Sequence, residues 1–308
     1  MYIEAPCKVN LHLKVLGKRS DGFHNLESVF ALLAFGDSLE VSVLSGKSGL
    51  TSLTMAPKGR TGLLWNEEIA SLSPEKNLVY KAASLFREQT GFDGDFSVTI
   101  KKSVPPGSGL GGGSSDAAAA LFAFNSIAGK PLSTERLLAA AARLGSDVPF
   151  FLSGETTAWV SGRGEVLQPL SPLFSGYGVL LVFPGFQSGT AEAYDFLDKN
   201  REKAADESPS PAKDEIIAAL DKSPALWPFT NDFLSVFLKT GGDRGERYAS
   251  ILDSLEDSGA LFRGLSGSGS ACFGIYRTKE DAERAKINFE KKYCVQNTNF
   301  LALRPFRH

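Results

Sequence analysis

One stretch decides the fold of this chain: Pro105-Pro106-Gly107-Ser108-Gly109-Leu110-Gly111-Gly112-Gly113-Ser114-Ser115-Asp116. Glycines lack side chains, so the backbone N–H groups of such a bend can approach a bulky anion closely. The residues that follow, Ala117 to Phe124, are mostly strong helix formers. Ser114, Ser115 and Asp116 are residue types that favour helix N-caps. We expect a phosphate-binding loop, with a helix that begins where the glycines end and directs its positive end at the phosphate.

Other glycine-rich phosphate loops fit this stretch poorly. It lacks the Gly-Lys-Ser/Thr ending of a Walker A loop. Gly107, Gly109 and Gly112 satisfy G-x-G-x-x-G, but a dinucleotide fold needs a second strand ending in an acid about twenty residues later. A second alanine-rich helix pattern follows Pro131 instead. The protein-kinase motifs V-A-I-K, H-R-D and D-F-G are also absent. A tight structural turn is the remaining alternative to a phosphate loop.

Composition limits the class of protein. The 308 residues (33.0 kDa) are enough for two domains. A formal net charge of −2 argues against nucleic-acid and anionic-membrane partners. Cys7, Cys272 and Cys294 are scattered, which predicts no disulfide framework. Residues 1 to 10 show no signal-peptide pattern, and no run of about eighteen apolar residues occurs. We therefore expect a cytoplasmic protein.

The residue pattern of three further segments predicts local structure. From Lys8 onward the first segment alternates apolar and polar residues, which predicts a half-buried strand with Lys8, Asn10 and His12 on one face. Residues 45 to 75 are rich in glycine and proline and predict a loop or hairpin. Around residues 200 to 214 charge, serine and proline predict a mobile surface segment.

The segment Gly145-Ser146-Asp147-Val148-Pro149-Phe150-Phe151-Leu152 predicts the end of one helix and the start of another. Glycine stops the first helix, and Asp147 stands where an N-cap residue precedes Pro149. Capping alone would explain an aspartate at this position. A catalytic role for Asp147 is compatible with capping.

The glycine stretch resembles the central motif of the GHMP kinase superfamily, small-molecule kinases that hold ATP phosphates in a glycine loop over a helix N-terminus. Residues 145–151 resemble its G-[AS]-D-V-P-F-F segment, and residues 264–276 resemble its third motif. The resemblance implies an α+β fold of two domains. Residues 1–160 would form an ATP-binding domain like domain 2 of ribosomal protein S5, and residues 161–308 a ferredoxin-like α/β sandwich.

The segment A-P-C-K-V-N-L-H-L-K-V-L-G-K-R-S-D-G-F-H, residues 5–24, narrows the resemblance to one branch of the superfamily. That branch phosphorylates the 2-hydroxyl of cytidine diphosphate methylerythritol, in the methylerythritol phosphate route to isoprenoids. The resemblance implies that Asp147 is the catalytic base and that Lys8 pairs with it. It also implies that Pro105 to Ser115 bind ATP. The implied substrate-binding residues are Asn10, Phe23, His24, Thr190 and Tyr194, with cytosine stacked between Phe23 and Tyr194.

The resemblance also sets expectations for cofactors and partners. We expect ATP and Mg²⁺, with Ser115 as a candidate metal ligand and Asp116 as a second one. The partner is a small-molecule substrate rather than a nucleic acid or a membrane, and the chain is expected to be a monomer or a weak homodimer. The alternatives are another GHMP kinase, of the homoserine or mevalonate type, and a non-catalytic nucleotide-binding regulator on the same scaffold.

Overall fold

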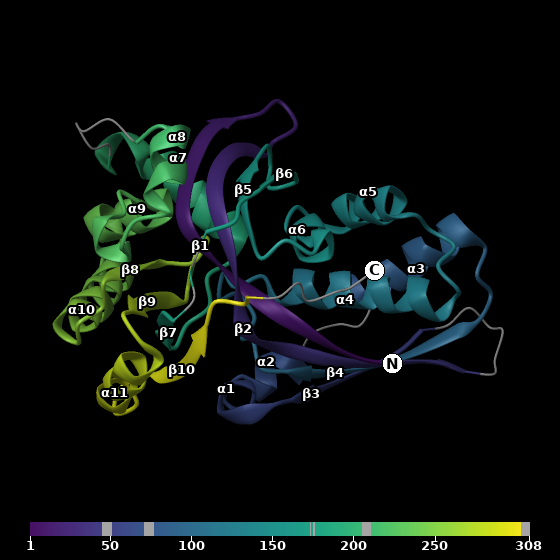
Figure 1. Ribbon diagram of the computed structural model, residues 1–308. Helices are drawn as coiled ribbons and strands as arrows, with labels where there is room; N and C mark the ends of the chain where they lie inside the picture. The colour runs from purple at the N-terminus through teal and green to yellow at the C-terminus, as the bar shows by residue number, and fades with distance from the viewer. Residues whose placement is uncertain (45–50, 71–76, 173, 175, 205–210, 303–308) are drawn as a thin grey trace.

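The computed structural model describes residues 1–44, 51–70, 77–172, 174, 176–204 and 211–302. The architecture is α+β, as predicted, with two sheets. Elements of the N-terminal half and elements of the C-terminal half lie side by side, and the long strands β1 and β2 run along their junction (Figure 1).

The first sheet has the strand order β3-β4-β2-β5-β6, and β1 pairs with β2 outside this path. All pairs are antiparallel except β3 with β4. Because β4 pairs with the central strand β2, the phosphate loop that follows β4 starts beside the core of the molecule. The strands are β1 (Tyr2–Lys18), β2 (His24–Leu44), β3 (Thr51–Pro57), β4 (Asp95–Lys102), β5 (Thr157–Ser161) and β6 (Val166–Pro169).

Helix α4 is the centre of the first half and packs on β1 and β2. Its alanine run, Ala117 to Ala120, is fully buried, since small side chains let neighbouring helices and strands approach closely. Helices α3, α5 and α6 pack against it. The helices of this half are α1 (Gly59–Leu64), α2 (Asn66–Ala70), α3 (Leu78–Thr90), α4 (Gly112–Ile127), α5 (Thr134–Leu144) and α6 (Val148–Ser153).

The second sheet is antiparallel, in the order β10-β7-β9-β8. Its strands are β7 (Gly178–Phe183), β8 (Phe262–Leu265), β9 (Cys272–Tyr276) and β10 (Cys294–Asn299). The accompanying helices are α7 (Thr190–Ala204), α8 (Lys213–Ala219), η2 (Pro224–Leu226), α9 (Asp232–Thr240), α10 (Asp243–Asp257) and α11 (Lys279–Phe289).

One expectation about irregular segments needs correction, and a second can be compared with the structure only at the ends of its segment. Within residues 45–75 the chain forms β3, α1 and α2, because β3 gains a hydrogen-bonding partner in β4 that is distant in sequence. In the expected mobile segment, α7 continues to Ala204 and α8 begins at Lys213. Residues 45–50, 71–76 and 205–210 lie outside the described part of the chain.

Strand β1 is buried on both faces from Ala5 to Leu13, and not half-buried as its alternation predicted. A register shift between Asn10 and His12 also changes which residues share a face. Leu11 therefore packs in the same cluster as Trp159, whereas Leu13 joins the other core cluster. His12 lies against Trp159 and does not share the surroundings of Lys8 and Asn10.

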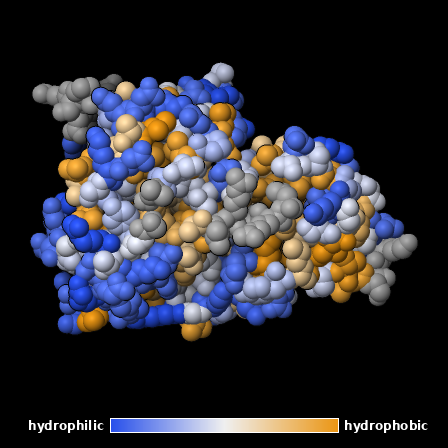
Figure 2. Space-filling model, viewed as in Figure 1, coloured by the Kyte–Doolittle hydropathy of each residue, from blue (hydrophilic) through white to orange (hydrophobic). Residues whose placement is uncertain are grey.

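Hydrophilic residues cover most of the C-terminal half on the face shown in Figure 2, with hydrophobic residues scattered among them. This surface agrees with a chain in which 22% of residues are charged. Among the described residues no helix has the length and apolar content needed to span a membrane.

Candidate active site

A cavity of about 450 Å³ lies at the N-terminal end of α4. The glycine stretch forms one wall, and β1, the residue before α6, and α7 supply polar side chains from other directions. Among the residues that line it are Lys8, Asn10, Pro105, Pro106, Gly107, Ser108, Gly109, Gly111, Gly112, Gly113, Ser114, Asp147, Thr190 and Tyr194. The structure thus gathers most of the residues that the sequence singled out around one space.

The carbonyl groups from Gly107 to Leu110 all point into the protein. The Gly107 carbonyl accepts hydrogen bonds from two backbone N–H groups, and the next three carbonyls each accept one hydrogen bond. Since the C=O and N–H of a trans peptide point in opposite directions, the N–H groups that follow these carbonyls face the other way. The donors are Ser188 N (2.9 Å) and Ser270 N (3.1 Å) to Gly107, Ala271 N (3.0 Å) to Ser108, Ser266 Oγ (3.0 Å) to Gly109 and Lys8 N (3.0 Å) to Leu110.

Helix α4 starts earlier than the sequence predicted. Its first residue is Gly112 and its N-cap is Gly111, which has a φ of 73°. Two glycines therefore lie inside the first turn. A Cβ at Gly112 would lie 2.9 Å from Val104 Cβ, so packing against the end of β4 excludes a side chain there. The first-turn amides belong to residues without bulky side chains, which is what close approach of an anion requires.

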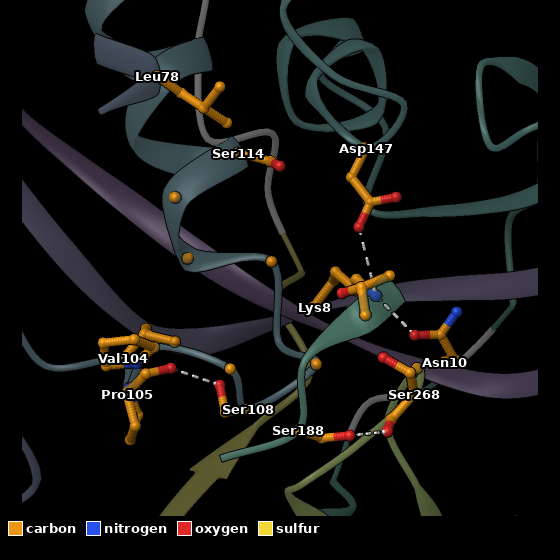
Figure 3. Close-up of a pocket in the computed structure, with 18 of the residues that line it drawn as sticks. Lys8, Asn10, Leu78, Val104, Pro105, Ser108, Ser114, Asp147, Ser188 and Ser268 are labelled. Atoms are coloured by element: carbon orange, nitrogen blue, oxygen red, sulfur yellow. Dashed lines mark hydrogen bonds and ion pairs between the residues drawn. The ribbon is translucent and has the colours of Figure 1, made fainter. Parts of the chain in front are cut away.

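Lys8 and Asp147 meet at the centre of the cavity, as Figure 3 shows. Lys8 Nζ lies 3.5 Å from Asp147 Oδ2 and donates a 2.6 Å hydrogen bond to Asn10 Oδ1. Only 3% of Lys8 is exposed, and its ammonium group lies 4.6 Å from the ring centroid of Phe30. The ammonium is therefore fixed by three neighbours rather than by solvent, and it faces a carboxylate that is 30% exposed.

Asp147 does not act as a helix cap. It precedes α6, but its backbone is helical (φ −82°, ψ −17°) and its side chain makes no capping hydrogen bond. The carboxylate faces Lys8 instead. Capping is therefore the wrong explanation for this residue.

The second glycine segment, residues 264–270, supports the phosphate loop. Asn231 Nδ2 donates to the carbonyls of Leu265 (2.8 Å) and Gly267 (2.9 Å), which holds this segment in place from the start of α9. Ser188 Oγ donates to the Ser268 carbonyl at 2.7 Å. Gly267, Ser268 and Ser188 also line the cavity. The C-terminal half therefore fixes the back of the loop and contributes to the cavity wall.

The residues expected to bind a cytosine are only partly brought together. Tyr194 lines the cavity and stacks on His24, with ring centroids 4.8 Å apart. His24 Nε2 bonds Asp198 Oδ1 at 2.9 Å. Burial, with smaller effects of nearby carboxylates, raises the pKa of Tyr194 to about 12. Its hydroxyl therefore stays protonated at neutral pH.

Phe23 does not face Tyr194 in this structure. Its ring lies under the Arg163 guanidinium, 4.9 Å from the ring centroid, and the residue is 52% exposed. Neither Phe23 nor His24 lines the cavity. Phe23 and Tyr194 therefore do not face each other, and His24 stacks on one face of the tyrosine ring.

The candidate metal ligand Ser115 faces away from the cavity. Its hydroxyl donates a 2.7 Å hydrogen bond to the Pro6 carbonyl, and the residue is fully buried. Asp116, the second candidate, lines the cavity but has one carboxylate oxygen bound to Lys102. Within the described residues no group of three or more His, Cys, Asp or Glu side chains has an arrangement that could hold a metal ion. Ser115 thus makes a structural bond, and the residues that the structure describes provide no dedicated cage for Mg²⁺.

Lys102 is a cavity residue that the sequence analysis missed. It is 5% exposed and bonds two carboxylates, Asp37 and Asp116. A signal was present, because Phe96, Val98 and Ile100 alternate in β4 and Lys102 continues their inward-facing pattern. A lysine at such a position predicts a buried ion pair.

Comparisons with known proteins agree with this architecture. Residues 77–155 match the model of the GHMP kinases N-terminal domain, and residues 230–294 match the GHMP kinases C-terminal model. The 4-diphosphocytidyl-2-C-methyl-D-erythritol kinase of Treponema pallidum (strain Nichols) is 37% identical over 299 residues, which cover 95% of each chain. The enzyme of the same name from Thermotoga maritima is 36% identical over 273 residues, covering 87% of this chain and 89% of that one.

Solved structures give the same result. A crystal structure of 4-(cytidine 5'-diphospho)-2C-methyl-D-erythritol kinase is 30% identical with a TM-score of 0.74, and the match covers 97% of this chain and 99% of that one. Homoserine kinase from Cytophaga hutchinsonii shares the fold at 17% identity, with a TM-score of 0.65 over 98% and 95% of the two chains. The chain belongs to the GHMP kinases and, within them, to the 4-diphosphocytidyl-2-C-methyl-D-erythritol kinase family.

Proposed function

We propose that this chain transfers the γ-phosphoryl group of ATP to the 2-hydroxyl of 4-diphosphocytidyl-2-C-methyl-D-erythritol, a step toward isoprenoid precursors. One observation carries the proposal: Lys8 and Asp147, 139 positions apart in sequence, form an ion pair of 3.5 Å inside the cavity that the phosphate loop lines. The names of the relatives at 36–37% identity give the acceptor alcohol.

In this proposal the phosphate loop holds the nucleotide. The amides that follow the inward-pointing carbonyls of Gly107 to Leu110, together with the N-terminal end of α4, offer donors to phosphate oxygens. Mg²⁺ would be bound chiefly by the phosphates of ATP and by water, since the described residues form no cage for it. When bound, it would supply positive charge that neutralises the phosphates.

Asp147 is the proposed general base. The alcohol oxygen forms a bond to the γ-phosphorus while the bond from that phosphorus to the β–γ bridging oxygen breaks, and ADP leaves with the electron pair. The proton of the alcohol passes to the Asp147 carboxylate as the new bond forms. Lys8 orients the carboxylate and stabilises negative charge on the transferring group. Asn10, which bonds Lys8 and Ser28, is placed to hold the substrate's other hydroxyls.

The cytidine end of the substrate is proposed to bind at the mouth of the cavity. Thr190 and Tyr194 line the cavity, and His24 stacks on Tyr194. The exposed ring of Phe23 offers a flat surface on which a base can stack. His24 can then bond the polar edge of the base.

Substitution of the base tests the proposal. Asp147→Asn keeps the size of the side chain but removes the proton acceptor, so we expect kcat to fall roughly 100- to 10,000-fold. Binding of a non-hydrolysable ATP analogue should stay unchanged, because the phosphate loop is intact. Turnover within about twofold of wild type, at unchanged nucleotide affinity, would refute the role of Asp147 as base.

Organisation and location follow from the same proposal. We propose an ATP-binding domain of residues 1–160 and a C-terminal domain of residues 161–308, although β6 still pairs with β5 of the first sheet. We also propose a cytoplasmic protein that acts on small molecules as a monomer or weak homodimer, without a nucleic-acid or membrane partner. The net charge of −2 supports the proposed absence of a nucleic-acid or membrane partner.

A further inference from the structure

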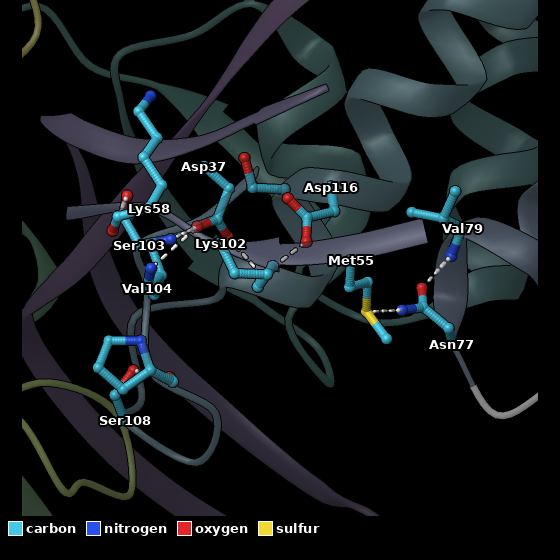
Figure 4. Close-up of polar contacts among 12 residues, drawn as sticks. Asp37, Met55, Lys58, Asn77, Val79, Lys102, Ser103, Val104, Ser108 and Asp116 are labelled. Carbon is cyan, nitrogen blue, oxygen red and sulfur yellow. Dashed lines mark hydrogen bonds and ion pairs between the residues drawn. The ribbon is translucent and has the colours of Figure 1, made fainter. Parts of the chain in front are cut away.

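Three ionisable side chains are buried together next to the phosphate loop, as Figure 4 shows. Asp37 belongs to β2, Lys102 ends β4 and Asp116 lies in α4. Lys102 Nζ donates hydrogen bonds to Asp37 Oδ2 and, at 2.7 Å, to Asp116 Oδ2. None of the three is more than 5% exposed. One ammonium group therefore links two carboxylates that come from different elements.

This cluster holds both ends of the phosphate loop. Asp37 Oδ1 accepts hydrogen bonds from the backbone N–H groups of Ser103 and Val104, the two residues before Pro105. Asp116 lies in the second turn of α4, three residues after the last glycine. Lys102 thus connects Asp37, which fixes the start of the loop, to Asp116, which follows the end of the loop.

The two ends of the loop are also in direct contact. A Cβ on Gly112 would lie 2.9 Å from Val104 Cβ and 3.3 Å from Asp37 Oδ2. A change in the separation of β4 and α4 would therefore alter the curvature of the loop between them. The amides that face the cavity would move with it, and productive geometry tolerates displacements of only about 0.5 Å.

The same cluster reaches the cavity. Lys102, Val104 and Asp116 line it, and Asp116 Oδ1 is buried without a hydrogen-bond partner among the described residues. Two acidic side chains share a single ammonium, and of their four oxygens only Asp116 Oδ1 has no hydrogen-bond partner among the described residues. A buried unsatisfied carboxylate oxygen is costly, and such costs are characteristic of functional sites.

We propose that Lys102 and Asp116 are positioning residues for ATP, which act with Asp37 by fixing the distance between the two ends of the phosphate loop. The inference rests on the proposed phosphoryl transfer from ATP. In the described part of the chain no hydrogen bond or ion pair joins these side chains to Lys8, Asn10 or Asp147. Breaking the cluster should therefore weaken nucleotide binding and leave binding of the alcohol almost unchanged.

The test compares two substitutions at one position. Asp116→Leu keeps the number and branching of the side-chain heavy atoms but removes the acceptor for Lys102, and we expect KM for ATP to rise about tenfold or more while KM for the alcohol stays within about twofold. Asp116→Asn retains a side-chain oxygen for Lys102 and should keep KM for ATP within about threefold of wild type. If Asp116→Leu does not fold, Asp116→Ser, whose hydroxyl is too short to reach Lys102, takes its place with the same expectation.

Asn125→Leu is the matched control. Asn125 is buried in the same helix and bonds the N–H (2.9 Å) and C=O (3.0 Å) of Leu132, far along α4 from the loop. Loss of the Asn125 side chain and its two hydrogen bonds should lower thermal stability but leave KM for ATP unchanged. The proposal is overturned if Asn125→Leu raises KM for ATP as much as Asp116→Leu does, or if Asp116→Leu raises both KM values equally or neither.

A binding measurement separates this inference from the proposed function. Calorimetric titration with a non-hydrolysable ATP analogue reports nucleotide affinity without turnover. Weaker binding by Asp116→Leu supports the positioning role even if the acceptor alcohol proves to be a different one. Equal affinity in wild type and Asp116→Leu contradicts the positioning role whatever the acceptor.

Discussion

His12 illustrates how a polar residue next to an active site can belong to the fold rather than to the chemistry. It lies two positions from Asn10, yet its ring packs near Trp159, and its Nδ1 accepts a 3.2 Å hydrogen bond from the Thr230 N–H. Nε2 is buried and has no partner within the described residues. Burial, and to a lesser extent the charge of Lys14, lowers the pKa of His12 to about 4. The folded protein therefore holds this histidine neutral.

The depressed pKa predicts a pH dependence of stability. An unfolded histidine titrates near 6.5, so between about pH 6.5 and pH 4 the unfolded state binds more protons than the folded state. Above that range the neutral His12 adds its full contribution to the free energy of unfolding. As the pH falls this contribution is lost, and the loss is about 2 to 3 kcal/mol at pH 4.5. Urea unfolding of wild type and His12→Asn at pH 7 and pH 4.5 measures it. The variant should lose less stability on acidification, and equal losses in both proteins would contradict this account.

At the scale of elements, the two glycine segments form one unit. Gly109 has a φ of +75°, and a Cβ there would lie 2.0 Å from the Ser266 carbonyl oxygen. Gly113 is different, because a Cβ there would meet nothing within 4 Å. Packing against the second segment therefore excludes a side chain at Gly109, whereas no neighbouring atom excludes one at Gly113.

Alanine substitutions distinguish the two positions. Gly109→Ala combines a backbone conformation that side chains disfavour with a clash against backbone, and we expect it to lower the free energy of unfolding by roughly 2 to 4 kcal/mol. Gly113→Ala lies in the first turn of α4 without a steric conflict and should leave stability within about 0.5 kcal/mol of wild type or raise it. Chemical denaturation of both variants provides the measurement. A Gly109→Ala protein as stable as Gly113→Ala would show that the two segments are not packed as described.

Local pattern predicted some elements well and others poorly, for identifiable reasons. The buried alanine helix follows from local signals and is confirmed. The start of α4 does not follow from local signals, because contact with Val104 places glycines inside the helix against their low helix propensity. Strand β3 was missed because its pairing with β4 is not encoded locally.

For the whole molecule, the decisive fact is that distant segments converge along β1. Lys8 in this strand meets Asp147, the residue before α6, and Arg201 of α7 donates to the carbonyls of Val15 (2.8 Å) and Leu16 (2.7 Å). Local sequence pattern made Lys8 part of a half-buried strand and Asp147 a helix cap; only the family resemblance paired them, and local pattern could not place them 3.5 Å apart. Nor could it show that His24 would take one face of Tyr194, since both contacts depend on how the two halves pack.

The most direct test of the central claim is the kcat/KM of the purified chain for phosphoryl transfer from ATP to three alcohols: 4-diphosphocytidyl-2-C-methyl-D-erythritol, homoserine and mevalonate. A site with hydrogen-bonding groups for a cytidine diphosphate should reject acceptors that lack it, so we predict a preference of at least about a thousandfold for the first. Equal rates with all three, or a preference for homoserine or mevalonate, would contradict the account.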